Sequence, residues 1–387
     1  MNSNEINELN EKSGSQKKFS LRELGGALGD WGTLIPFIIG YVSIVEFNPA
    51  GIFLTLGITN IILGIRFNLP LPVQPQKTIG AIALSQKWNV NLVISTGFGT
   101  GIVWTLLGFS KTLNKIVKKI PLVTVRAVQL GLGLILGWTA ITLIIDNIIL
   151  GLISMIIIVL FINSKRIPSA IILVILGIIL LFYTSSIVLT DIKFTLPHFD
   201  FFIPDLGNII IGMILAGFAQ LFLTLTNVMI ATIVLIEDLF PEKEVKISAN
   251  SLALNMGVMN LVNPFLGGIP LCHGSGGLAA QYAFGARTGG SMILEGIIEI
   301  ILGLFFSDTL LLIFSKFPSA IFGAMLLYTA YLLVNISYKN YTKKTFIIIL
   351  ISGLICFIFY FIIGSFSITL GFFTALALYF LFSKKIS

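Results

Sequence analysis

Two short polar stretches with matching chemistry interrupt long apolar runs in the two halves of the chain. The first covers residues 70–84 and is rich in proline and glutamine, and the second covers residues 267–282 and is rich in glycine. Each leads into a short segment that can form a helix, at a corresponding place in its half. In a membrane protein, paired interrupted segments of this kind point to a substrate site. The pattern therefore predicts a secondary transporter.

The residue types in the two stretches suit the binding of an anion. Three prolines in the first stretch force extended backbone and prevent helix before Gln76. We expect half-helices to begin near residues 76–78 and 274–276. A helix start exposes unpaired N–H groups and about half a positive charge. Two such starts that meet at mid-membrane would form a cradle for a small oxyanion.

Side chains beside the two helix starts add further donors. Lys77 would contribute a full positive charge, and glycines let a ligand approach the backbone without a Cβ in the way. Lys77 could instead pair with Asp30 or reach an interface. His273 could be a packing residue rather than a ligand contact or proton site. The candidate substrate-binding residues are Gln74, Gln76, Lys77, Thr78, Gln220, Asn227, His273, Gly274, Ser275 and Gly276.

Two other apolar segments carry polar residues that would support this site. Residues 25–33 are small residues around one acid, a composition that permits close helix contact. Gln220, Thr224 and Asn227 recur at helical spacing and share one face. That face either bonds to neighbouring helices or forms a cavity wall, and the two interpretations have equal weight. The supporting residues that we predict are Asp30, Thr33 and Thr224.

Glu295 and Glu299 lie four residues apart in a later apolar segment and also share a face. Carboxylates inside a membrane span are functional candidates and can relay protons. The alternative is that they pair with Arg287 near the inner end of the segment. We do not predict them as substrate ligands.

The sequence gives no sign of catalytic or metal chemistry. The chain has two cysteines and two histidines, and Cys272-His273 lacks further ligands at a spacing that suits a metal. No nucleophile–base pair is evident, and the cysteines offer no disulfide framework. We expect no cofactor, no bound metal and no enzymatic activity.

The composition predicts an all-α polytopic membrane protein. Hydrophobic residues make up 56% of the 387 residues and charged residues 11%, whereas soluble domains carry about a quarter charged residues. Apolar runs separated by short loops give fourteen segments, at residues 24–45, 49–65, 70–86, 90–109, 122–144, 146–163, 167–188, 208–236, 247–263, 264–286, 290–306, 308–336, 345–363 and 366–382.

The order of these segments predicts an internal repeat. A polar loop from Asp191 to Gly207 separates seven segments from seven, and the broken segment is third in each set. A repeat with an odd number of segments places its second copy upside down in the bilayer. We therefore expect a 7+7 inverted repeat in which segments 3 and 10 are broken.

The basic residues predict the orientation. With the N-terminus inside, all 24 lysines and arginines lie on the inner side except Lys77 and the three outer residues Lys87, Lys193 and Lys316. This bias follows the positive-inside rule and places both termini in the cytoplasm. The net charge of +7 then requires no nucleic-acid partner. Residues 1–20 are polar and are expected to form a disordered cytoplasmic tail.

Several motifs resemble those of the molybdate transporter family, a branch of the sulfate permease superfamily. The matching segments are residues 26–33, 72–78, 128–131, 219–227, 272–279 and 285–289. The chain departs from the family pattern at Gln76, where methionine is usual, and at Ala283, where arginine is usual. Sulfate permeases append a cytoplasmic regulatory domain, and this chain shows none after its last apolar run, which agrees with the molybdate branch.

The resemblance implies a fold like that of the uracil permease. A core domain would comprise residues 21–110 and 208–307, with segments 1–4 and 8–11. A gate domain would comprise residues 111–190 and 308–387, with segments 5–7 and 12–14. The resemblance also implies import of molybdate across a plasma or inner membrane by alternating access. Relatives of this fold often pair through the gate domain, so a homodimer is a further expectation.

Other functions remain open on the sequence alone. Sulfate or another oxyanion would satisfy the same donors. A nucleobase permease would want an acidic residue where Gln220 stands, and a passive anion channel would want a continuous charged pore, which is not evident. The coupling ion is equally open between a proton, sodium and none.

Overall fold

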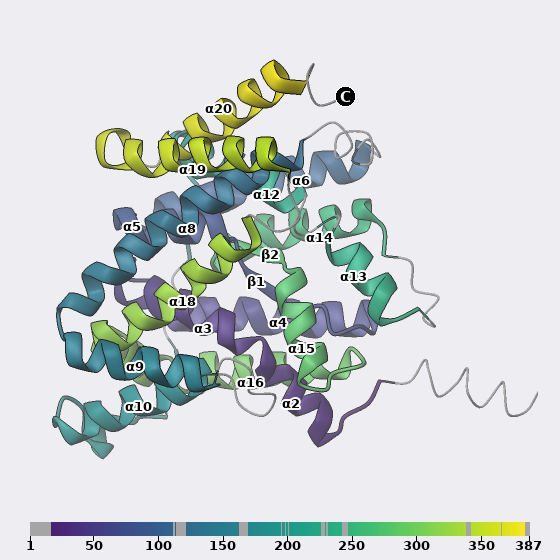
Figure 1. The fold of residues 1–387 in the computed structure, drawn as a ribbon. Coiled ribbons are helices and arrows are strands. Elements are labelled where there is room, and N and C mark those ends of the chain that lie inside the picture. The colour runs from purple at the N-terminus through teal and green to yellow at the C-terminus, as the bar shows by residue number, and fades with distance from the viewer. Residues whose placement is uncertain are drawn as a thin grey trace, which may run out of the picture.

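The protein is almost entirely helical, with one small sheet at its centre (Figure 1). The structure is a computed structural model. It describes residues 17–383 except 111–112, 114–120, 162–168, 195, 198, 200, 226–228, 230, 242–246, 338–341 and 365. The predicted tail therefore lies mostly outside the described residues.

The elements of the first half follow the predicted order of segments. They are α2 (Leu21–Gly29), α3 (Trp31–Ser43), α4 (Pro49–Phe67), β1 (Val73–Pro75), α5 (Lys77–Gln86), α6 (Val90–Ser110), α8 (Leu122–Ile145), α9 (Ile148–Phe161), α10 (Ser169–Tyr183) and the short 3₁₀ turn η1 (Leu189–Asp191).

The second half repeats a short strand and half-helix at the corresponding place. Its elements are α11 (Leu206–Gly212), the π-helical η2 (Met213–Gly217), α12 (Phe218–Thr224), α13 (Ala231–Leu239), α14 (Ala249–Val262), η4 (Asn263–Leu266), β2 (Leu271–His273), α15 (Ser275–Ala283), α16 (Gly290–Phe305), α17 (Ser307–Ser315), α18 (Ser319–Ser337), α19 (Lys343–Ile363) and α20 (Phe366–Ser383).

Local sequence signals explain where these helices begin and end. α4 starts at Pro49, which is favourable in a first turn, and the Asn48 side chain accepts a hydrogen bond from the Ala50 N–H at 3.0 Å. α4 ends at Asn68, whose φ of 50° is the left-handed conformation that stops a helix. α5 begins at Lys77, two residues after Pro75, which is the last proline of the first broken segment.

Many of the helices can cross a membrane. In the part of the chain that the structure describes, five helices are long and apolar enough by themselves: α4, α6, α8, the continuous stretch Leu206–Thr224, and α19. A sixth span results if α16 and α17, which are bent by 86°, are counted together. Large apolar side chains such as Ile149, Leu160 and Ile362 point outward and are mostly exposed, as expected for a surface that faces lipid.

The structure divides two of the predicted spans. The segment predicted at 24–45 is two helices, α2 and α3, which meet at Asp30. The segment predicted at 308–336 is wrong as a single span, because α17 ends at Ser315 and α18 begins at Ser319. Pro318 lies between them and cannot continue a helix.

Close helix packing relies on small residues at two interfaces. α16 packs along α4, and α14 packs along α6. A Cβ added at Gly57 of α4 would lie 2.6 Å from the Gly296 carbonyl oxygen, and a Cβ at Gly101 of α6 would lie 3.0 Å from Asn260. Such contacts allow helix backbones to approach within a membrane, where no hydrophobic effect drives association.

The small sheet joins the two broken segments at the centre of the molecule (Figure 1). β1 and β2 are antiparallel, with Val73 opposite His273 and Pro75 opposite Leu271. Both strands are fully buried. Extended backbone at membrane depth is tolerated only when protein or a water-filled cavity surrounds it, and here the ladder and the surrounding helices supply that protection.

Candidate anion-binding site

Two half-helices begin at the ends of the central sheet. α5 starts at Lys77, with only Gln76 between it and β1, and α15 starts at Ser275, with only Gly274 between it and β2. The helix starts therefore agree with the expectation from the proline and glycine patterns. The Gln76 N–H donates to the Pro270 carbonyl at 2.9 Å, which fixes the end of one arm against the other. The first N–H groups of both helices are thus presented near the middle of the protein.

Gln220 contacts the start of α5. Its Oε1 accepts a hydrogen bond from the Thr78 N–H at 2.8 Å, and its Nε2 donates to the Thr224 hydroxyl at 2.8 Å. The carboxamide oxygen therefore occupies a position that an anion oxygen would take at this helix start. Gln220 follows the π-helical turn η2, a type of distortion that is frequent at functional sites.

Thr78 carries a second donor, its side-chain hydroxyl, at the same helix start. Its side chain is fully buried, and its hydroxyl has no hydrogen-bond partner among the residues that the structure describes. Buried hydroxyls are normally bonded, so a lone one in a native structure requires an explanation. A ligand that accepts this hydrogen bond would supply one.

Asp30 and Gln74 form a buried pair that supports the site. The Gln74 Nε2 donates to Asp30 Oδ1 at the junction of α2 and α3. A Cβ added at Gly277 of α15 would lie 2.8 Å from the same oxygen and 2.9 Å from the Gln74 Nε2. The acid therefore lies against both broken segments.

Four more candidates surround the start of α15 or α5. Gly276 is exposed, and a Cβ placed on it would meet no heavy atom within 4 Å. Lys77 is partly exposed at the first position of α5. His273 is fully buried, the Pro72 carbonyl lies near its ring, and neither ring nitrogen makes a well-formed hydrogen bond within the described residues. Gly274 lies against the Gln74 carboxamide.

Gln76 is directed toward the scaffold. Its Nε2 lies 3.0 Å from the Thr100 hydroxyl of α6 and 3.1 Å from the Leu271 carbonyl of β2. The side chain therefore fastens the first broken segment to α6 and to the second broken segment. Thr33 and Ser275 lie in the first turns of α3 and α15, and Asn227 is outside the described residues.

Two asparagines hold the arms in place, and the sequence analysis did not identify them. Asn60 of α4 accepts from the Val73 N–H at 3.1 Å. Asn260 of α14 accepts from the Leu271 N–H at 2.8 Å and donates to the Leu271 carbonyl at 2.7 Å. Both side chains are buried and satisfy backbone groups that the short ladder leaves open. The sequence did contain a signal for them, because each is a carboxamide side chain in an otherwise apolar span. Burying a carboxamide costs free energy unless it is hydrogen-bonded.

The two carboxylates of α16 are bonded to carboxamides. Glu299 accepts from Asn60 Nδ2 at 2.9 Å, and Glu295 accepts from Gln281 Nε2 at 2.6 Å. The Arg287 guanidinium instead donates to the carbonyls of Tyr282 and Ala286 and lies 3.5 Å from the Tyr282 ring centroid. The contacts observed for these acids are therefore with α4 and α15.

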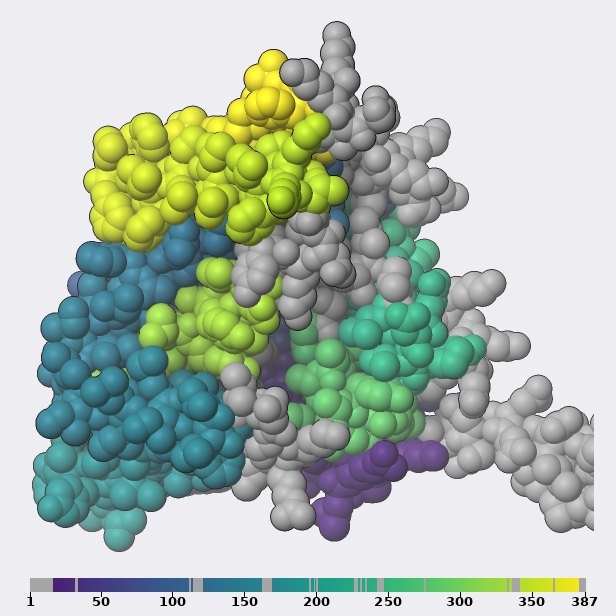
Figure 2. All heavy atoms as spheres, in the orientation of Figure 1, coloured from purple at the N-terminus to yellow at the C-terminus, as the bar shows by residue number. Residues whose placement is uncertain are grey.

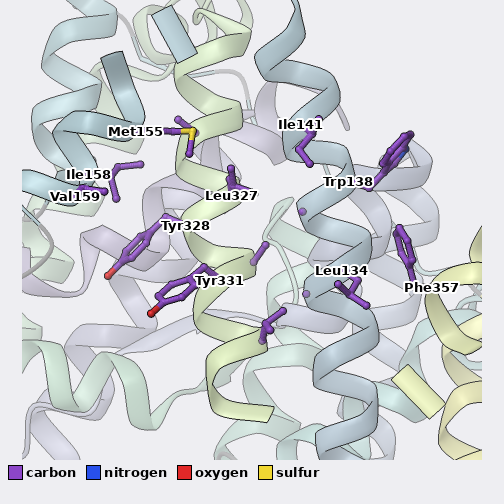
Figure 3. A pocket seen from close by; sticks show the side chains of 15 residues that line it. Leu134, Trp138, Ile141, Met155, Ile158, Val159, Leu327, Tyr328, Tyr331 and Phe357 are labelled. Atoms are coloured by element: carbon purple, nitrogen blue, oxygen red, sulfur yellow. The ribbon is translucent and has the colours of Figure 1, made fainter. Parts of the chain in front are cut away.

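A large cavity lies elsewhere and has a different character. It measures about 760 Å³ between α8, α9, α18 and α19, and Figure 3 shows the side chains of Trp138, Tyr328 and Phe357 along it. Its lining is almost entirely apolar, so it does not suit an anion. Among the described residues, no group of three or more histidine, cysteine, aspartate or glutamate side chains is arranged to hold a metal ion.

Solved structures with a similar fold are anion transporters. The transmembrane domain of a cyanobacterium bicarbonate transporter, BicA, aligns with a TM-score of 0.65 at 13% identity over 92% of this chain and 97% of that chain. Murine Solute Carrier 26 family member A9, described as an anion transporter in the inward-facing state, aligns with a TM-score of 0.69 at 12% identity over 95% of this chain and 69% of that chain. At these identities the likeness concerns the fold.

Sequence relatives are more specific. The chain is 32% identical to Molybdate transporter 2 of Arabidopsis thaliana, over 94% of this chain and 87% of the relative. It is 31% identical to Molybdate transporter 1 of the same plant, over 80% and 78%, and 25% identical to Molybdate transporter 1 of Chlamydomonas reinhardtii, over 79% and 81%. These relatives are transporters and not enzymes, as expected from the absence of catalytic motifs.

A family model described as "Molybdate transporter of MFS superfamily" matches residues 22–136 and 205–333. Those ranges contain both broken segments, both half-helices and the helices that carry Asn60, Gln220 and Asn260. With this match and the relatives above, the chain belongs to the molybdate transporter family of integral membrane anion transporters.

Proposed function

We propose that this protein imports molybdate by alternating access and holds the anion between the starts of α5 and α15. The observation that carries the proposal is the unused hydrogen-bonding capacity at these starts, above all the buried Thr78 hydroxyl and the open space in front of Gly276. The names of the sequence relatives supply the substrate. A tetrahedral oxyanion has several acceptor oxygens and would satisfy such donors.

Most candidate residues have a part in this proposal. Lys77 supplies positive charge, Thr78 and Ser275 supply hydroxyl donors, and Gly274 and Gly276 admit the anion to the backbone. Gln220 leaves the Thr78 N–H when an anion oxygen replaces its carboxamide oxygen, and Thr224, which accepts a hydrogen bond from Gln220, supports it there. Gln74 and Asp30 orient the second helix start. Gln76 acts through its contacts with α6, and His273 lies at the edge of the site.

The fold proposal is a fourteen-segment 7+7 inverted repeat with segments 3 and 10 broken. Three observations support it. β1 pairs with β2, α4 packs on α16 while α14 packs on α6, and Asn60 and Asn260 hold corresponding arms. In a 7+7 repeat, segment 2 corresponds to segment 9 and segment 4 to segment 11. A twofold axis would therefore place the pair α4 and α16 (segments 2 and 11) onto the pair α14 and α6 (segments 9 and 4).

The domain proposal assigns residues 21–110 and 208–307 to a core and residues 111–190 and 308–387 to a gate. On the face in Figure 2, atoms of α8–α10 (blue to teal) and of α19–α20 (yellow) gather on the left, and atoms of α2 (purple) and α15 (green) gather on the right. We further propose that both termini are cytoplasmic and that the protein resides in a plasma or inner membrane. A homodimer stays a prediction.

Equilibrium binding to the purified protein tests the substrate. Molybdate is titrated into the protein in detergent, first alone and then against an excess of sulfate. We expect molybdate binding that survives sulfate. Equal competition by sulfate would make the protein a general oxyanion permease and would direct attention to Gln76, the departure from the family pattern. Absence of binding by either anion would contradict the proposed function.

A further inference from the structure

Two buried carboxylates of α16 each have one oxygen without a well-formed hydrogen bond in the described chain. Glu295 is 1% exposed and Glu299 is 0% exposed. The Oε2 atoms accept from Gln281 and Asn60 at 2.6 Å and 2.9 Å. Neither Oε1 atom makes a well-formed hydrogen bond with the residues that the structure describes, and the Trp31 indole lies near Glu295. A buried polar atom in this situation points to something that binds there.

The carboxamides that contact these acids belong to the two broken segments or hold them. Asn60 donates to Glu299 and accepts from the Val73 N–H of β1. Gln281 lies in α15, donates to Glu295 and accepts from the Ser291 hydroxyl at 2.9 Å. Each carboxylate therefore bonds to a carboxamide that holds or belongs to one arm of the candidate anion site. This contact links the protonation of either acid to the position of that arm.

Among the described residues, the groups that act on the two carboxylates carry no positive charge. Asp30 is the third acid that faces them, and Trp31 lies beside Glu295. The charged residues on the packed elements are engaged elsewhere, within the described chain. Glu23 of α2 accepts from the N–H groups of Arg287 and Thr288, Arg22 lies against Gly285, Arg66 of α4 lies over the Phe67 ring, Arg287 contacts Tyr282, and Asp308 lies in the first turn of α17.

A buried carboxylate without a cation is strongly unfavourable when charged. Both acids can be relieved of that charge by a proton on the open Oε1, which leaves the bond from the carboxamide to Oε2 intact. A metal cation would require several oxygens around it, and the described acids do not form such a group. The geometry therefore favours a proton as the bound cation.

We propose that Glu295 and Glu299 form a proton-binding site that couples the transport of the anion to an inward movement of protons. Each carboxylate gains one O–H bond from a hydronium ion on the outer side and loses that proton on the inner side. Two protons would balance the two negative charges of a tetrahedral oxyanion such as molybdate. The inference rests on the proposed function, because it assigns the coupling ion of the same transporter.

The first test uses the wild-type protein in proteoliposomes with a pH-sensitive dye inside. At clamped membrane potential and without sodium, we expect added molybdate to acidify the lumen, with about two protons for each anion. Anion uptake without proton movement, or uptake that requires sodium, would overturn the inference while leaving the proposed function intact. Failure of molybdate binding and exchange would instead remove the proposed function.

The second test uses Glu295→Gln and Glu299→Gln, which resemble the protonated acids in shape and charge. We expect both variants to bind molybdate and to exchange it across the membrane at equilibrium. Accumulation driven by a pH gradient should fall at least tenfold. The control is Glu46→Gln, an exposed acid in the loop before α4, which should accumulate molybdate normally. Gradient-driven accumulation that survives in the double variant would overturn the inference.

Discussion

At the level of single residues, the buried polar side chains divide into those that hold the arms and those with hydrogen-bonding capacity left over. Asn60, Asn260 and Gln76 bond to backbone or to neighbouring helices. The Thr78 hydroxyl does not, although it is fully buried at the second position of α5. Whether a buried polar side chain is already hydrogen-bonded within the protein therefore distinguishes a scaffold residue from a candidate anion-binding residue better than its residue type does.

Thr78→Val should weaken molybdate binding while leaving the fold unchanged. The substitution removes a hydroxyl that has no described protein partner but keeps the shape of the side chain. A hydrogen bond to a charged ligand is worth roughly 1.5–3 kcal/mol, which corresponds to about a 10- to 150-fold loss of affinity. Calorimetric titration measures the loss, and thermal unfolding should shift little.

Thr78→Ser is the matched control because it keeps the hydroxyl. Its affinity should stay within a few-fold of that of the wild-type protein. If Thr78→Val binds molybdate as tightly as Thr78→Ser, the hydroxyl has no part in binding and the site lies closer to α15.

Residue types alone allowed the helix starts to be located, but they did not give the direction of each side chain. Gln76 and Gln74 are adjacent to the same helix start, yet one bonds to Thr100 and the other to Asp30. Asn60 and Asn260 were missed because their partners, Val73 and Leu271, are determined by tertiary packing. A one-dimensional pattern contains no such information.

At the level of elements, proline and glycine positions decided what could be foreseen. The broken segments were predictable because Pro70, Pro72 and Pro75 disfavour helix in the residues before Gln76, and α5 and α15 begin where expected. The predicted boundary between residues 306 and 308 coincides with the junction of α16 and α17, but the 86° bend at that junction was not foreseen. The hydropathy of a segment indicates whether its side chains prefer lipid or water, and it carries no information on the angle between two successive helices.

Gly57→Ala should destabilise the pair of helices α4 and α16. The new Cβ would lie 2.6 Å from the Gly296 carbonyl oxygen and 2.7 Å from Ile300, so the helices must separate. Overpacking of this kind costs typically 1–3 kcal/mol, and the unfolding temperature in detergent should fall by several degrees.

Gly137→Ala is the control for this prediction. Gly137 lies in α8, and its added Cβ would be 3.7 Å from Ala330, an ordinary contact. Alanine also favours helix over glycine by about 1 kcal/mol, so this variant should be as stable as the wild-type protein or more stable. Equal losses in both variants would mean that the close approach of α4 and α16 is unimportant.

At the level of the whole molecule, alternating access requires the proposed core to move against the proposed gate. Few polar contacts cross that boundary in the described chain. The Tyr360 hydroxyl of α19 donates to the Ser85 carbonyl of α5 at 3.1 Å, and the Thr369 hydroxyl of α20 donates to the Ile214 carbonyl of η2 at 2.9 Å. An interface with so few directional bonds suits a sliding motion, because little must be broken at each step.

A bridge between Ser85 and Tyr360 should stop transport without preventing binding. Both side chains are partly exposed, so the pair Ser85→Cys and Tyr360→Cys can be joined by a short bis-maleimide. The native cysteines, Cys272 and Cys356, are buried and should react slowly. We expect the bridged protein to lose molybdate uptake in proteoliposomes but to retain binding of the anion. The two single variants, treated with the same reagent, should transport normally. Full uptake by the bridged protein would show that this contact need not open, which would place the moving boundary elsewhere or favour a channel over a transporter.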